Sequence, residues 1–78
     1  MNKKITLDFL PPGTCGKILA LTATGDLGQR LMDLGFYPGV EFRVIRNAPL
    51  RDPFEMEMMG YCISLRRQEA GFVEVEPL

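Results

Sequence analysis

The chain has 78 residues, of which 46% are hydrophobic and 24% are charged. A chain of this length forms a single domain, spanning residues 1–78, and its ordinary composition argues against both a disordered tail and a membrane segment. Nine basic and ten acidic residues give a formal net charge of −1, which lacks the basic excess typical of nucleic-acid binding, so we expect no nucleic-acid partner and no membrane insertion.

The N-terminal part of the chain indicates strand and turn. Ile5, Leu7 and Phe9 alternate with polar residues in a short lead-in, and residues 14–21 predict a β-strand. Gly16 within that strand indicates a bend or a bulge, as a tightly curved sheet requires. The basic start of the chain is not followed by the long apolar region of a signal peptide, so we expect a cytoplasmic protein.

One helix is predicted, within residues 25–39. Leu27, Leu31 and Leu34 fall at positions i, i+4 and i+7, which places them on one face of a helix of about two turns. A helix this short is not stable alone in water, so we expect its leucine face to pack against the rest of the protein.

Both ends of this helix carry recognisable signals. Asp26 and Gln29 have the spacing of a capping box at the N-terminus. Gly35 can adopt the left-handed conformation that ends a helix, and Phe36 can then fold back onto Leu31 in a Schellman motif. The next residues, Tyr37-Pro38-Gly39-Val40, have proline and glycine where a type II turn requires them.

Four strands and a second helical turn are predicted beyond this point. Phe54, Met56 and Met58 alternate with glutamates, and the Met59-Gly60 pair predicts a tight turn into a second strand of a hairpin. The bounds that we expect for the remaining elements are a strand over 40–47, a proline-containing loop over 47–53, hairpin strands over 54–58 and 61–65, a helical turn over 67–71 and a last strand over 72–76.

The fold class that follows is mainly β. About five short antiparallel strands and one inserted helix, in fewer than 80 residues, predict a small, strongly bent sheet closed into a barrel. Closure also hides strand edges that would otherwise pair with other chains.

The sequence offers no catalytic constellation, so we do not expect an enzyme. It contains no histidine, which excludes histidine-based catalysis and histidine-bound zinc or iron. Cys15 and Cys62 lie far apart without metal-binding spacing, and we interpret both as small apolar fillers that stay reduced. The acidic residues near the hairpin supply too few converging oxygens for a firm cation site, so we predict neither a metal nor a cofactor.

Three segments carry a family resemblance. They are Arg30 to Gly39 (RLMDLGFYPG), Val44 to Pro53 (VIRNAPLRDP) and Ile63 to Ala70 (ISLRRQEA). Together they resemble the bacterial ferrous iron transport protein A family, FeoA, over almost the whole chain from about Leu7 to Val75. One departure is Arg51, where the family usually has glycine in its A-P-L-G-D-P loop, and this departure affects loop conformation more than membership.

The resemblance implies an SH3-like barrel without catalytic activity, located in the cytoplasm. It also implies a role beside the membrane ferrous iron permease FeoB, which carries a cytosolic G-protein domain. An alternative stays open, because the same fold and signature occur in the C-terminal domain of iron-dependent DtxR-type repressors. On that alternative the chain is a stand-alone SH3-like regulatory module, although the absence of a winged-helix segment favours the transport protein.

A small, histidine-free barrel is suited to act by contact, and we expect the contact surface where the helix and the following turn lie beside the barrel. Exposed aromatic and arginine side chains are common interface anchors. The expected partner-binding residues are Arg30, Leu31, Met32, Phe36 and Tyr37, with all of them except Leu31 expected to be exposed. Under the competing interpretation, Leu31, Leu34 and Phe36 only build the barrel. A weak homo-oligomer is also left open, because strand edges of small barrels often pair.

Overall fold

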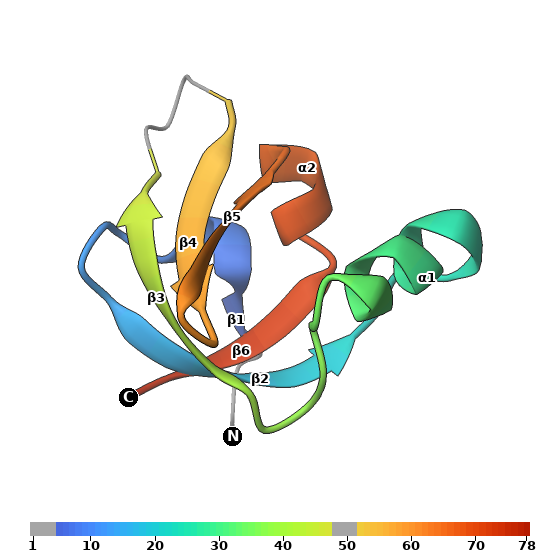
Figure 1. The fold of residues 1–78 in the computed structure, drawn as a ribbon, viewed down its shortest axis with the longest axis horizontal. Coiled ribbons are helices and arrows are strands. Elements are labelled where there is room, and N and C mark those ends of the chain that lie inside the picture. The colour runs from blue at the N-terminus through green and yellow to red at the C-terminus, as the bar shows by residue number, and fades with distance from the viewer. Residues whose placement is uncertain (1–4, 48–51) are drawn as a thin grey trace.

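A computed structural model describes residues 5–47 and 52–78 and shows a strongly curved sheet with short helices beside it (Figure 1). The prediction of a mainly β barrel is therefore confirmed, with six strands in place of about five. In chain order the elements are β1 (Ile5–Thr6), the 3-10 helix η1 (Leu7–Phe9), β2 (Cys15–Leu21), α1 (Gly25–Asp33), β3 (Glu41–Arg46), β4 (Phe54–Met58), β5 (Tyr61–Leu65), α2 (Arg67–Ala70) and β6 (Val73–Pro77).

All pairs in the sheet are antiparallel, in the order β1-β6-β2-β3-β4-β5. The sixth strand is the two-residue β1, which pairs with β6 where the sequence suggested only a lead-in. Figure 1 shows β2 and β6 running side by side at the base of the molecule, with β4 and β5 standing across the core from them. The helix α1 lies to one side of the sheet, and α2 lies between α1 and the upper ends of β4 and β5.

The core is apolar and lies inside the curved sheet. Strand residues enter it at alternate positions, as the two-residue period of a strand requires, so Met56 and Met58 are buried while the intervening glutamates face outward. The largest fully buried side chains are Phe36, Phe54, Leu7, Ile18, Leu31, Met56, Met58, Leu65, Val44 and Val73.

The C-terminal end of α1 has the predicted Schellman motif. The Gly35 N–H donates to the Met32 carbonyl at 2.9 Å, and the Phe36 N–H donates to the Leu31 carbonyl at 3.1 Å. Gly35 has a φ of +105°, and Phe36 and Leu31 are both fully buried. The turn after it also forms as predicted, because the Val40 N–H donates to the Tyr37 carbonyl at 3.1 Å.

The predicted capping box at the other end of α1 is wrong. The helix begins at Gly25 after Thr24, so Asp26 lies inside the first turn. Its negative charge interacts favourably with the helix dipole there, but its side chain makes no capping hydrogen bond. The Gln29 side chain instead donates to Asp33 Oδ1, four residues later, at 2.9 Å.

Two further expectations require correction. The sheet does bulge in β2, but the register shifts between Ile18 and Ala20 and not at Gly16. Gly16 is required by close packing, since a Cβ there would lie 2.6 Å from Cζ of Phe42. The two cysteines are exposed and not core fillers, because their positions in β2 and β5 face away from the core.

The loop over 47–53 is described only at its ends, and the departure at Arg51 lies outside the described residues. The Asn47 side chain donates to the carbonyls of Asp8 and Leu10 and accepts from the guanidinium of Arg67. At the other end, Asp52 Oδ1 accepts from the Arg67 N–H at 2.6 Å. The Asn47 end therefore holds α2 beside η1, and the Asp52 end holds the first residue of α2, which explains why polar residues flank this loop.

A substitution in α1 tests how closely the helix packs. Gly28→Ala should destabilise the protein by about 1–3 kcal/mol, although alanine is the better helix former, because the new Cβ would lie 2.7 Å from the Ala23 carbonyl oxygen. Urea unfolding measures the effect. The exposed neighbour Gln29→Ala is the control and should change stability by less than about 0.5 kcal/mol. A more stable Gly28→Ala variant would contradict this packing.

Candidate functional site

The five residues expected to bind a partner divide into two groups. Arg30, Met32 and Tyr37 are exposed. Leu31 and Phe36 are fully buried, so the expectation that Phe36 is exposed is wrong. The physical reason is the Schellman motif, which turns Phe36 back under the helix onto Leu31. These two side chains therefore fix the helix against the barrel from below, and only the other three can touch a partner directly.

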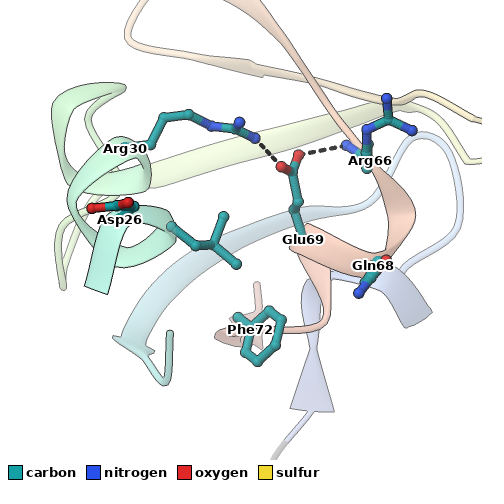
Figure 2. Close-up of a pocket in the computed structure, with 7 residues that line it drawn as sticks. Asp26, Arg30, Arg66, Gln68, Glu69 and Phe72 are labelled. Carbon is teal, nitrogen blue, oxygen red and sulfur yellow. Dashed lines mark hydrogen bonds and ion pairs between the residues drawn. The ribbon is translucent and has the colours of Figure 1, made fainter. Parts of the chain in front are cut away.

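The Arg30 side chain reaches from α1 to α2. Its guanidinium forms an ion pair with the Glu69 carboxylate, as Figure 2 shows. The arginine side chain is 57% exposed, whereas the glutamate side chain is only 13% exposed. The pair therefore joins two elements that are 39 residues apart in the sequence.

Glu69 has a second role that the sequence analysis missed. Its Oε1 atom accepts from the Arg66 N–H at 2.9 Å, while its Oε2 atom accepts from Arg30 (Figure 2). The first contact caps the N-terminus of α2, which is only four residues long and has few hydrogen bonds of its own. One carboxylate thus both caps α2 and ties it to α1.

A groove of about 360 Å³ lies between α1 and α2, and we call it the helix groove (Figure 2). Leu27 and Phe72 supply apolar lining, and the polar lining includes the Arg30 and Glu69 side chains. A hollow of about 390 Å³ shares Arg30, Arg66 and Glu69 with it and continues toward Ser64 and Leu65 on β5. The ion pair lies where the two spaces adjoin.

The side chains of two exposed residues in the β4–β5 hairpin reach Gly35 at the end of α1. The Tyr61 hydroxyl donates to the Leu34 carbonyl at 2.8 Å, and a Cβ on Gly35 would lie 2.6 Å from Cε of Met59. Met32 and Tyr37 flank the same glycine along the chain, each linked to it by a backbone hydrogen bond of 2.9 Å. We call the four exposed residues the Met/Tyr patch, and its members are Met32, Tyr37, Met59 and Tyr61.

Two members of the patch were absent from the sequence expectations. Met59 was interpreted only as a turn residue, and Tyr61 only as part of an alternating strand. Their proximity to α1 follows from the sheet order, which no local pattern contains. One signal was available, since a large apolar residue in a two-residue hairpin turn departs from the usual asparagine, aspartate or glycine.

Other kinds of site find little support among residues 5–47 and 52–78. No group of three or more cysteine, aspartate and glutamate side chains gathers there in a way that could hold a metal ion. No helix in the same ranges is long and apolar enough to span a membrane.

Comparisons with known proteins agree with this architecture. The model of the FeoA domain family matches residues 5–77. A relative from Porphyromonas gingivalis (strain ATCC BAA-308 / W83), an Fe(2+) transport protein A/Fe(2+) transporter FeoB fusion protein, is 37% identical over 70 residues. The match covers 90% of this chain but only 8% of that relative, so the chain spans a small part of its length.

Two solved structures share the fold. The zinc complex of Stenotrophomonas maltophilia FeoA, named as a prokaryotic SH3 domain protein, has a TM-score of 0.82 and 29% identity, covering 92% of this chain and 89% of that one. A manganese-dependent transcriptional repressor has a TM-score of 0.89 but 15% identity, covering 100% of this chain and 38% of that chain, and this likeness shows the fold alone.

The link between the helices can be tested with a double-mutant cycle of Arg30→Ala and Glu69→Ala. We expect a coupling free energy of about 0.2–1 kcal/mol that falls as salt is added, because the arginine is largely exposed. Glu69→Ala should cost more than Arg30→Ala, since it removes both the ion pair and the oxygen that caps α2. Urea unfolding at low and high salt measures both effects, and equal costs for the two single variants would contradict the double role of Glu69.

Proposed function

The chain belongs to the FeoA domain family, as its sequence motifs indicated, and we propose that it is an accessory protein of bacterial ferrous iron uptake that acts by direct contact with a FeoB-like membrane permease. Its role is to bind a protein partner, not to catalyse a reaction. We place it in the cytoplasm, on the side where the resemblance locates the G-protein domain of the permease.

The observation that carries this proposal is the fusion protein of P. gingivalis. There a segment 37% identical to this chain is covalently joined to an Fe(2+) transporter. Linking two binding modules gives them a high effective concentration, so fusion suits a pair that works in contact. The name of the S. maltophilia structure, which proposes a ferrous iron transport activating factor, supports the same role for that relative.

The surface that we propose for the contact comprises α1 and the turn that follows it. Arg30, Met32 and Tyr37 offer exposed side chains of the kinds that anchor interfaces. Leu31 and Phe36 belong to the site indirectly, because they are buried beneath it and hold the helix in place. The same arrangement leaves the helix groove beside the contact surface (Figure 2).

The alternative role as a regulatory module has weaker support. The likeness to the manganese-dependent repressor lies at 15% identity and concerns the fold. The ferrous iron transport role has support from relatives at higher identity, so it is the function that we propose.

Replacement of Tyr37 tests the contact. Tyr37→Ala should weaken binding to a purified, detergent-solubilised FeoB-like permease about tenfold, because a half-exposed aromatic anchor is removed. Fluorescence titration with and without guanine nucleotide measures the affinity and shows whether the contact depends on the nucleotide state. Phe9→Ala is the matched control. Phe9 is 75% exposed and belongs to η1, which is not part of the proposed surface.

Arg30→Ala should weaken the same binding, and its matched control is Arg46→Ala. Both arginines are exposed and both form ion pairs, Arg30 with Glu69 and Arg46 with Glu55. A loss of stability alone would affect the two variants alike, so a selective effect of Arg30 locates the surface on α1. If the wild-type chain does not bind the permease either with or without guanine nucleotide, the proposed function itself is contradicted.

A further inference from the structure

The turn between β4 and β5 contains an unusual residue. Met59 has a φ of +54° and Gly60 a φ of +85°, so both residues of this two-residue turn lie in the left-handed region. Glycine adopts that region freely, whereas a residue with a Cβ is disfavoured there by steric contact with its own backbone. Asparagine is the usual first residue of such a turn, and a methionine there does not favour the local fold.

Burial of the Met59 side chain does little to offset this unfavourable backbone conformation. It is 58% exposed, although its Cε atom lies against the backbone of Gly35. Its neighbour Tyr61 is held by the hydrogen bond from its hydroxyl to Leu34, yet 45% of that residue is exposed. The patch therefore presents apolar surface that its own fold does not cover. Exposed methionine and tyrosine in one place are typical of protein contact sites.

The charges around the Met/Tyr patch are mostly acidic. Asp33 follows Met32 at the end of α1, and Glu41 lines a hollow of about 390 Å³ together with Met59. Arg43 lines the same hollow, but its guanidinium is paired with Glu57 at 3.3 Å.

The row of residues across β3, β2 and β6 adds to this acidic character. Lys17 on β2 lies between Glu41 on β3 and Glu76 on β6, so the three side chains carry one net negative charge. The border of the patch therefore suits a partner with positive charge.

We propose that the Met/Tyr patch binds a basic amphipathic segment of the partner protein, with apolar residues on the patch and lysine or arginine beside Asp33 and Glu41. This inference rests on the proposed function and adds the chemistry of the partner's binding segment. A second copy of the chain fits less well, because a symmetric contact would bring the acidic border of one patch against that of the other. On this proposal, Met59 contributes to the contact with the partner although it disfavours the conformation of the turn.

Met59→Asn separates binding from folding. Asparagine suits the left-handed turn, so the variant should unfold in urea at a midpoint at least as high as that of the wild type. It should nevertheless bind the partner segment about tenfold more weakly, because the most exposed apolar side chain of the patch is lost. Phe9→Asn is the matched control, since it removes an exposed apolar residue elsewhere and should leave binding unchanged.

The probe is a synthetic helical peptide of leucine and lysine, compared with its leucine and glutamate counterpart. Methionine methyl signals in NMR report the site, because Met32 and Met59 are exposed whereas Met56 is fully buried and serves as the internal reference. We expect saturable shifts at Met32 and Met59 with the lysine peptide only. Equal shifts with both peptides, shifts confined to other residues, or unchanged affinity of Met59→Asn would overturn the proposal.

Two further measurements distinguish this inference from the function on which it rests. Permease binding that is equal for wild type and Met59→Asn would overturn the patch while the accessory role stands. Binding of the permease to neither protein would contradict the accessory role, and the peptide titration would still test the patch. Self-association that rises with concentration and disappears in Met59→Asn would assign the patch to a second copy and overturn the basic segment.

Discussion

At Gly35 the backbone enters the left-handed region, with a φ of +105°, and the chain turns away from α1. Three consequences depend on this residue. The helix ends there, Phe36 is directed into the core, and the space that a Cβ would fill is occupied by the ends of Met59 and Tyr61. A single glycine therefore joins the helix, the core and the hairpin turn, because glycine alone combines this conformation with so close an approach.

The two helices are attached to the barrel in different ways. Buried leucine and phenylalanine side chains hold α1 against the barrel. The four-residue helix α2 is held by polar contacts at its own N-terminus. Asp52 and Glu69 each accept a backbone N–H there, and Glu69 also binds Arg30. The barrel thus places a groove beside α1 and an exposed apolar patch near the C-terminal end of the same helix, and both features suit a protein that acts by contact.

Much of the fold was predictable because its determinants are local. Alternation over residues 54–65 predicted the bounds of β4 and β5, and the signals at Gly35 and Phe36 predicted the Schellman motif. One local prediction failed, because the helix starts earlier in the chain than the Asp26 capping box requires. The other predictions that failed depend on neighbours that are distant in the sequence. The cysteines proved exposed because strand register decides which face each occupies, and Gly16 proved necessary because Phe42 packs against it from the adjacent strand.

By itself, the sequence determined five of the six strands in the described residues, the helix and its ending, the family, and the absence of any histidine-based chemistry. These properties follow from residue identity and from patterns within a few positions along the chain. Only the tertiary structure decided that Phe36 is buried, that Arg30 meets Glu69 and that Met59 and Tyr61 lie beside the end of α1. Each of these contacts joins residues brought together by sheet order and packing, and such pairings leave no local pattern in the sequence.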